Sequence, residues 1–158
     1  MGDLALLLKR LIEHRVDFVI VGGFAAATHG VTLITRDLDV ACRFSTANLL
    51  RLQDAVKDLH PVHRMTPQRL PLCLTPETIP GLKNIYVDTD WGSLDCLSSV
   101  LGIGDFAAVK KKSEIINPGL GPCRILKIDA LIKAKKAMGR DRDRAAVLQL
   151  RAIQERQK

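Results

Sequence analysis

Residues 19–40 read VIVGGFAAATHGVTLITRDLDV, and the rest of the chain is organised around this stretch. Its apolar beginning predicts a β-strand that ends at the pair Gly22-Gly23. The alanine-rich segment 23–29 predicts a short helix, and Gly30 is placed to end it. Apolar and acidic residues then alternate, which predicts a second, half-buried strand.

The acidic residues of this second strand are Asp37 and Asp39. Residues i and i+2 of a strand point to the same face, so both carboxylates project together, about 7 Å apart along the strand. Such a pair suits shared ligation of divalent cations, which prefer oxygen ligands. Gly22 and Gly23 open the helix, where free backbone N–H groups and the helix dipole can receive a phosphate. Together these features predict a bound nucleoside triphosphate (NTP) with Mg²⁺. The alternative is a plain tight turn followed by two acids on a solvated strand face.

This combination resembles the DNA polymerase beta-type nucleotidyltransferase superfamily. The signature of that superfamily is an apolar strand, Gly-Gly or Gly-Ser, an intervening segment, and Asp-x-Asp on the next strand; here the intervening segment is 24–36. The resemblance implies an α/β (α+β) fold in which a mixed β-sheet is flanked by helices. It also implies Mg²⁺-dependent transfer of a nucleoside monophosphate from an NTP to a hydroxyl group.

One position departs from the family pattern. Many relatives carry an arginine two residues before the Thr or Ser that precedes Asp-x-Asp, whereas this chain has Leu33 there and Thr35 as the threonine. The match implies that Thr35 lies at the nucleotide. Arg36 and Arg43 are the candidates to substitute for the absent guanidinium.

Length and composition indicate one folded domain. The chain has 158 residues, of which 47% are hydrophobic and 26% charged. We expect a single nucleotidyltransferase domain over 1–158, with a catalytic sheet core over 1–128 and a C-terminal helical pair over 129–158. No apolar run is long enough to span a membrane, and the N-terminal segment carries charges within its first turns. These features argue against a membrane partner and predict a cytoplasmic protein.

The cysteines are scattered through the chain, without CxxC or Cys/His clustering. They are Cys42, Cys73, Cys96 and Cys123. This spacing indicates neither a zinc site nor a disulfide framework. We expect all of them to be buried small hydrophobic residues in a reducing compartment.

The remaining periodicities predict further elements. Expected helices cover 3–14, 46–59, 130–138 and 140–153, and a loop with a short helix covers 102–112. The expected N-caps are Ser45 for 46–59, Asp105 for the short helix and Asp129 for 130–138, which Gly139 ends. Expected strands cover 17–21, 83–88, 93–98 and 123–128, and a turn over 89–92 joins two of them into a hairpin. Residues 60–82 show little periodicity and are expected to be a surface excursion beside the active site.

Asp95 lies between apolar residues in the second strand of the expected hairpin. A carboxylate in such a strand needs a partner, because an isolated buried charge is costly. The resemblance makes Asp95 the third member of a metal-binding and catalytic triad with Asp37 and Asp39. The alternative is a salt bridge to a nearby lysine, and Asp88 and Asp90 are rivals for the role.

The C-terminal stretch DALIKAKKAMGRDRDRAAVLQL resembles the helical pair of a bacterial minimal nucleotidyltransferase group related to abortive-infection (AbiEii-like) toxins. By this resemblance Lys135 reaches the triphosphate, and Asp143 orients either the triphosphate or the acceptor side of the pocket. The alternative for both residues is an exposed helical ion-pair network that contributes little to stability.

The net charge of +7 favours a polyanionic partner. Together with the toxin resemblance, this charge predicts RNA as the acceptor, in particular the tRNA 3′ end, bound through the basic C-terminal helices. The resemblance also implies a toxin–antitoxin or phage-defence setting, with a cognate antitoxin or toxin protein as a possible partner. The alternative is that the basic residues are solvated helix faces. The expected cofactors are two Mg²⁺ ions, which Mn²⁺ can replace.

Three other functions stay open at this point. The first is AMP transfer to a partner protein such as a toxin, and the second is nucleotidylation of a small molecule such as an aminoglycoside. The third is a nucleotide-binding or antitoxin module that has lost catalysis. The low aromatic content, 4%, argues against RNA recognition by base stacking.

Overall fold

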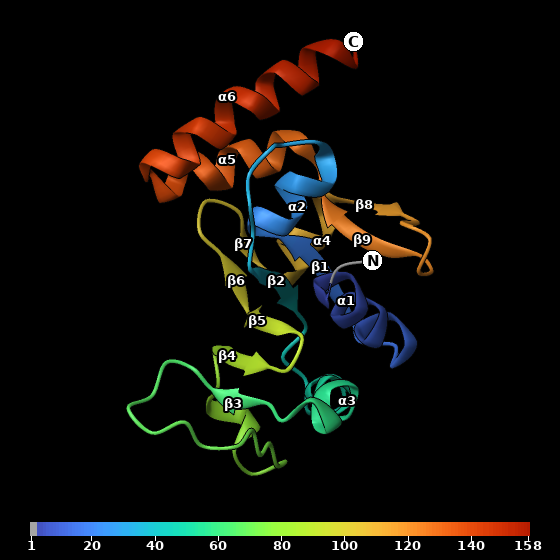
Figure 1. Cartoon of the computed structure of the whole chain (residues 1–158), viewed down its shortest axis with the longest axis vertical. Coiled ribbons are helices and arrows are strands. Elements are labelled where there is room, and N and C mark those ends of the chain that lie inside the picture. The colour runs from blue at the N-terminus through green and yellow to red at the C-terminus, as the bar shows by residue number, and fades with distance from the viewer. Residues whose placement is uncertain (1–2) are drawn as a thin grey trace.

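The computed structural model describes residues 3–158, and within this range a seven-stranded mixed sheet forms the centre of the molecule (Figure 1). Its strand order is β3-β4-β5-β2-β1-β9-β8, and a small second sheet joins β6 to β7. The strands are β1 (Phe18–Val21), β2 (Asp37–Cys42), β3 (Val62–His63), β4 (Asn84–Thr89), β5 (Gly92–Leu97), β6 (Ser99–Val100), β7 (Gly104–Asp105), β8 (Ser113–Ile116) and β9 (Cys123–Leu126). The helices are α1 (Asp3–Glu13), α2 (Gly22–His29), α3 (Thr46–Val56), α4 (Phe106–Lys111), α5 (Ile128–Met138) and α6 (Asp141–Arg156), with short 3-10 helices η1 (Lys57–Leu59) and η2 (Ile79–Gly81).

Strand β2 lies in the middle of the sheet, antiparallel to β1 and parallel to β5. The hairpin partner of β5 is β4. The register places Asp39 opposite Asp95, and Asp95 in turn opposite Tyr86. Because directly paired residues on neighbouring strands point to the same side, these three side chains share one face of the sheet.

The other face of the central strands is apolar. Leu38 and Val40 of β2 and Leu94 of β5 are fully buried. Helix α1 packs against α3 and also contacts β2 and β5. The buried leucines of these helices recur at helical spacing: Leu7, Leu8, Leu11, Leu49 and Leu52. The hydrophobic core on this side leaves the opposite face of β2 and β5 for polar groups.

Helices α5 and α6 pack against each other, and both contact α2. Figure 1 shows this helical layer at one end of the molecule, with β3 and the loop that follows it at the other end. No helix within residues 3–158 has the length and apolar character needed to cross a membrane.

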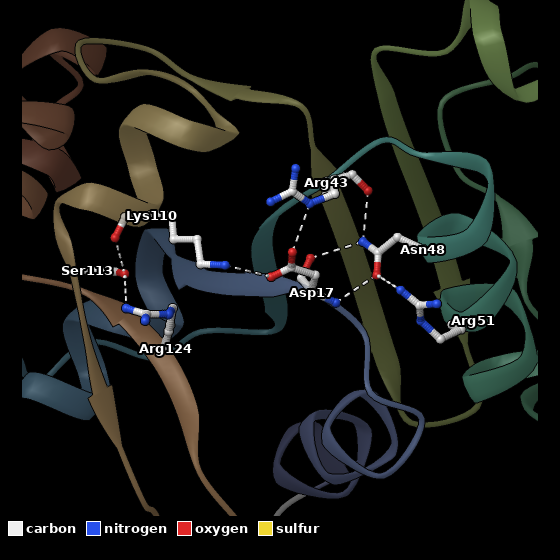
Figure 2. A network of polar contacts seen from close by, with 7 residues as sticks. All are labelled: Asp17, Arg43, Asn48, Arg51, Lys110, Ser113 and Arg124. Atoms are coloured by element: carbon white, nitrogen blue, oxygen red, sulfur yellow. Dashed lines mark hydrogen bonds and ion pairs between the residues drawn. The ribbon is translucent and has the colours of Figure 1, made fainter.

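A polar network ties the elements together at the end of β1 and β2 that lies away from Asp37 (Figure 2). The buried Asn48 side chain accepts a hydrogen bond from the Asp17 N–H at 2.7 Å and donates to the carbonyl groups of Asp17 and Arg43 at 3.0 and 2.8 Å. The Asp17 carboxylate also pairs with Arg43 Nε at 2.9 Å and with Lys110 Nζ at 3.6 Å. The start of α3 and helix α4 are thereby fastened to the strand ends, with every polar atom of Asn48 satisfied.

The expected elements around the glycine pair and the acidic residues are confirmed. Gly30 and Gly139 adopt the left-handed conformation and end α2 and α5. The Ser45 hydroxyl accepts from the Asn48 N–H at 3.2 Å, and the Asp105 carboxylate accepts from the Ala108 N–H at 3.0 Å, as predicted for N-caps.

Several details differ from the predictions. Asp129 does not cap α5, because the helix begins at Ile128 with Lys127 as its N-cap, which places Asp129 inside the first turn. Helix α6 begins at Asp141 and extends to Arg156, beyond the expected end. The strands β3, β6, β7 and β8 were not predicted. Strand β8 has an exposed residue next to a buried one without regular alternation, and pairing with β9 defines it.

The cysteine prediction holds in part. Cys42, Cys96 and Cys123 are buried, whereas Cys73 is exposed in the loop before η2. Among the described residues all four thiols are free. The correction for Cys73 follows from its place in the irregular excursion, where little of the chain packs against the core.

Candidate active site

Three carboxylates meet on the polar face of the sheet. Asp37 and Asp39 come from β2 and Asp95 from β5. One carboxylate oxygen of each residue lies within 4.8 Å of the others. The two-residue period of β2 puts Asp37 beside Asp39, and the parallel register brings Asp95 opposite Asp39. The predicted triad is therefore assembled in space. Of the rival acids, Asp88 pairs with Arg69 and, at 3.9 Å, with Arg64, and Asp90 pairs with His60.

The environment of the triad disfavours three full negative charges. Burial, followed by the nearby charges of Asp95 and Asp37, raises the pKa of Asp39 to about 7. Burial also raises the pKa of Asp95, against the opposing effect of Arg64. In addition, Oδ1 of Asp39 is buried without a hydrogen-bond partner among the described residues. An orphaned, buried carboxylate oxygen between two other carboxylates lacks a positive partner.

These features fit a divalent metal ion. The donor set consists of carboxylate oxygens, which Mg²⁺ and Mn²⁺ prefer over nitrogen and sulfur ligands. A cation at this position would satisfy Oδ1 of Asp39 and offset the mutual repulsion of the acids.

The glycine pair lies against the same cluster. Gly22 has φ +65°, and a Cβ atom built on it would stand 2.3 Å from Oδ2 of Asp39. A Cβ atom on Gly23 would stand 3.2 Å from Oγ1 of Thr35. The N-cap of α2 is Val21, which offers no side-chain hydrogen bond to the first turn. The first N–H groups of α2 are therefore without a capping side chain at a point where a phosphate group fits.

A cavity of about 500 Å³ opens on the glycine side of the triad. It brings Gly23, Thr35 and Lys135, which were predicted from sequence, next to Asp37 and Asp39. The other lining residues are Leu33, Ile34, Arg36, Arg140 and Arg142. Basic side chains and helix N–H groups thus surround one side of the acidic cluster, as an anionic ligand requires.

The two candidates for the missing family arginine are separated by the structure. Arg36 lines the cavity beside Asp37. Arg43 follows the other end of β2, where it pairs with Asp17 at 2.9 Å (Figure 2). The expectation that Arg43 substitutes for that arginine is wrong, because the length of β2 separates it from the triad.

Asp143 is fully buried and anchors two of the basic residues. Its carboxylate accepts from Arg140 Nε at 2.6 Å and from the Arg140 N–H at 3.2 Å, and Lys135 Nζ lies 3.5 Å away. Burial opposes ionisation of Asp143, but hydrogen bonds from Arg140 prevail and hold its pKa below the usual value. Asp143 thus contacts Lys135 and Arg140 of the cavity wall, while it is not itself among the lining residues.

Sequence reasoning missed Arg64, which lies in the irregular segment 60–82. Its Nη2 donates to Oδ1 of Asp95 at 2.6 Å, and its guanidinium lies over the Tyr86 ring, 5.7 Å from the centroid. The alternative prediction for Asp95, a salt bridge, is therefore realised together with the triad, although with an arginine in place of a lysine. No periodic pattern marks Arg64, because β3 is only two residues long.

A second cavity of about 700 Å³ opens on the other side of the triad. It shares Asp37, Asp39, Arg140 and Arg142 with the first cavity, and Asp95 lines only this second one. Its remaining walls come from β4, from β5, from the segment 99–104 and from the end of α5: Asn84, Tyr86, Leu97, Ser99, Val100, Leu101, Gly102, Ile103, Gly104 and Met138. Two cavities that differ in their remaining walls therefore meet at the triad.

Solved structures of other proteins share this fold. No family model matches the sequence, and no curated protein sequence matches it. The lincomycin-bound crystal structure of the lincosamide antibiotic adenylyltransferase LnuA is similar, with a TM-score of 0.64 and 12% identity, over 96% of each chain. The solution structure of the antibiotic-resistance factor ANT(2'')-Ia is also similar, with a TM-score of 0.56 and 16% identity, over 99% of this chain and 83% of the other.

At these identities the likeness shows the fold alone, which this chain shares with the adenylyltransferase LnuA and with ANT(2'')-Ia. The predicted fold class, a mixed sheet flanked by helices with a C-terminal helical pair, is confirmed. Neither similar structure belongs to the abortive-infection toxin group by its description, so that finer assignment stays a prediction.

Proposed function

We propose that this chain is a nucleotidyltransferase that moves a nucleoside monophosphate from an NTP to a hydroxyl group of a small molecule. The observation that carries the proposal is the position of the acidic triad between a basic cavity and a second cavity of different lining. A transferase needs such a division, because the donor and the acceptor must reach the reacting atoms from opposite sides.

The basic cavity is the proposed NTP site. The N–H groups of Gly22 and Gly23 at the start of α2 would contact phosphate oxygens, and Thr35 lies against Gly23. Lys135 and Arg140 would neutralise the charge that develops on the departing pyrophosphate. The role of Asp143 would be to hold these two cations in place, which refines its predicted orienting role.

Asp37, Asp39 and Asp95 would hold the divalent metal ions. When bound there, such ions supply Lewis acidity toward phosphate oxygens and make a hydroxyl group easier to deprotonate. Burial is the main cause of the raised pKa of Asp39, and its unpartnered Oδ1 atom is the one that a bound cation would satisfy. Two Mg²⁺ ions, with Mn²⁺ as a substitute, remain our prediction.

Asp95 is the proposed general base. It alone of the triad lines only the acceptor cavity, so its carboxylate is the one that an acceptor hydroxyl meets without a competing phosphate. The acceptor oxygen would attack the α-phosphorus as its proton passes to Asp95. The bond from the α-phosphorus to the oxygen that bridges the β-phosphorus would break, and pyrophosphate would leave into the basic cavity.

A small acceptor is favoured over RNA by the comparison with LnuA. That enzyme is described as a lincosamide antibiotic adenylyltransferase bound to lincomycin, and it matches this chain over 96% of both lengths. A chain of this size can therefore form both a nucleotide site and a small-molecule site. Neither comparison supports RNA, an antitoxin or a toxin as partner, so the tRNA acceptor stays a prediction without further support.

The proposal is tested by supplying each α-³²P-labelled NTP with Mg²⁺ to the purified protein and three acceptor pools. The pools are hydroxyl-bearing small molecules, total bacterial tRNA and lysate protein. Label in a small molecule with release of pyrophosphate supports the proposal. Label in tRNA or in protein would replace it with one of the predicted alternatives, and the absence of any NTP-derived product in all pools would overturn it.

A matched pair of variants accompanies this experiment. Asp39→Asn removes a triad carboxylate, and we expect loss of the labelled product. Asp54→Asn removes an exposed carboxylate on α3, outside both cavities, and we expect unchanged product.

A further inference from the structure

The acceptor cavity has a large apolar wall. Leu97, Val100, Leu101, Ile103 and Met138 line it. Leu101 and Met138 are 62% and 47% exposed, although large aliphatic side chains usually seek burial. They come from the turn after β6 and from the last residue of α5, so two separate elements present apolar surface to one cavity. Exposed apolar side chains gathered around a hollow are typical of a binding site.

Once divalent ions occupy the triad, the other charged groups of the same cavity are unsuited to a cationic ligand. Outside the triad, no carboxylate lines this cavity among residues 3–158, whereas Arg140 and Arg142 do. The Oδ1 atom of Asp95 is already bonded to Arg64 at 2.6 Å. Arg142 lines both cavities and makes no hydrogen bond or ion pair within the described chain, so no carboxylate offsets its charge.

The carboxylates close to this wall are also engaged. Asp88, on the strand β4 that contributes Asn84 and Tyr86, accepts from Ser93 Oγ at 2.7 Å and pairs with Arg69 at 2.5 Å. Its pKa is lowered by these hydrogen bonds, from Ser93 first and then from Arg69. With metal ions on the triad, an ammonium group entering the cavity would therefore find no unpaired carboxylate on β4, and it would approach two guanidinium groups.

We propose that the acceptor is an amphipathic hydroxyl compound, with an apolar part that rests on Leu97, Leu101 and Met138, and that polycationic acceptors are excluded. This inference rests on the proposed function, because only a transferase has an acceptor. It rejects the aminoglycoside alternative that the sequence left open. The apolar part would replace water on the wall, and the hydroxyl group would face Asp95 across the strand β5, on which Leu97 and Asp95 share one face.

The test measures binding in the cavity with Mg²⁺ present and NTP absent, so that the metal ion offsets the charge of the triad. The probes are chloramphenicol, a neutral amphipathic diol, and kanamycin, a polycationic amino sugar, titrated into protein labelled at methionine methyl groups. We expect chloramphenicol to shift the Met138 methyl resonance and to bind at least about tenfold more tightly than kanamycin.

Two matched variants sharpen this test. Leu101→Asp places a carboxylate on the apolar wall, and we expect it to weaken chloramphenicol binding about tenfold and to strengthen kanamycin binding. Leu148→Asp makes the same change at a leucine that is 70% exposed on α6 and lines neither site cavity, and we expect no effect on either probe. Both positions are exposed, so neither change disturbs the core.

Two results would overturn the inference. One is kanamycin binding as tight as that of chloramphenicol, and the other is a Met138 resonance that no amphipathic probe shifts. Because NTP is absent, this experiment can fail while nucleotidyl transfer to some hydroxyl compound is still observed. Conversely, probe binding can be found in a protein that transfers no label, in which case the proposed function falls and the cavity assignment stands.

Discussion

The Nη2 atom of Arg64 lies 2.6 Å from Oδ1 of Asp95, which joins the irregular segment 60–82 to the face of the sheet that carries the acidic triad. Only a quarter of the Arg64 side chain is exposed, and its Nη1 atom is buried without a hydrogen-bond partner among the described residues. Arg64 therefore supplies a positive charge to the acid that we propose as general base.

Arg64→Gln is expected to lower kcat at least about tenfold at pH 7. Arg64 lowers the pKa of Asp95 against the effect of burial, so its removal raises that pKa further. A base must be deprotonated to act, and the acid limb of the pH–rate profile should therefore move to higher pH. Arg69→Gln is the control, because Arg69 pairs with Asp88 and not with Asp95. An acid limb that coincides with that of the wild type would remove Arg64 from this role.

Gly22→Ala is expected to destabilise the protein by about 1–3 kcal/mol and to abolish transfer. The new Cβ atom would meet Oδ2 of Asp39 at 2.3 Å, in addition to the strain of φ +65°. Gly119→Ala is the matched control, because Gly119 has φ +88° with no atom within 4 Å of a built Cβ. Chemical denaturation of both variants separates the clash from the backbone strain, and equal losses of stability would refute the clash.

Metal binding is expected to depend on pH through Asp39. Its pKa of about 7 means that a metal ion must displace a proton below neutral pH. The apparent affinity for Mg²⁺ should therefore rise with pH and level off above about pH 7, with proton release measurable by calorimetry in buffers of different ionisation enthalpy. A pH-independent affinity between pH 5 and pH 8, about two units below and one above this pKa, would contradict the assignment.

The same group predicts the pH dependence of stability without metal. The pKa of Asp39 is raised from 3.8 in the unfolded chain to about 7 in the folded chain, so the folded state binds the proton more tightly. The resulting stabilisation is fully present below about pH 4 and is lost as pH rises through 7. Asp39→Asn removes this pH dependence. Denaturation of the wild type and of Asp39→Asn between about pH 4 and pH 8 would reveal it as a difference in stability that changes with pH.

Asp143→Asn is expected to cost about 2 kcal/mol of stability and to raise the KM for NTP more than it changes kcat. The variant leaves Arg140 and Lys135 without the buried carboxylate that they now contact. Asp141→Asn, at a side chain that is 95% exposed, should cost less than about 0.5 kcal/mol. A KM for NTP that is the same in both variants would show that Asp143 does not position the cavity cations.

The local pattern of the sequence was sufficient to predict Asp37, Asp39 and the glycine pair as neighbouring parts of the site. The period of β2 puts Asp37 and Asp39 on one face whatever the rest of the chain does. The glycine pair is also readable locally as a strand-to-helix turn, although the approach of Asp39 to Gly22 comes from the pairing of β1 with β2. The parity of β2 and the turn needed no knowledge of distant contacts.

The tertiary structure decided the positions of Asp95, Arg64 and the apolar wall of the acceptor cavity. Asp95 joins the triad only because β5 lies parallel to β2 in one register, and a slip by one residue would turn it to the opposite face. Arg64 and Leu101 come from irregular or short segments, and packing brings Leu101 together with Leu97 of β5 and Met138 of α5. Likewise, Arg36 and Arg43 are close in sequence but lie at opposite ends of β2.

The sequence by itself thus determined which residues could carry nucleotidyl-transfer chemistry, because strand parity and glycine conformation act within a few residues. The tertiary structure alone decided which carboxylate completes the triad, which cation accompanies it and what surface the acceptor meets. The physical reason is that strand pairing and side-chain packing depend on contacts between residues far apart in the chain, and no local periodicity records them.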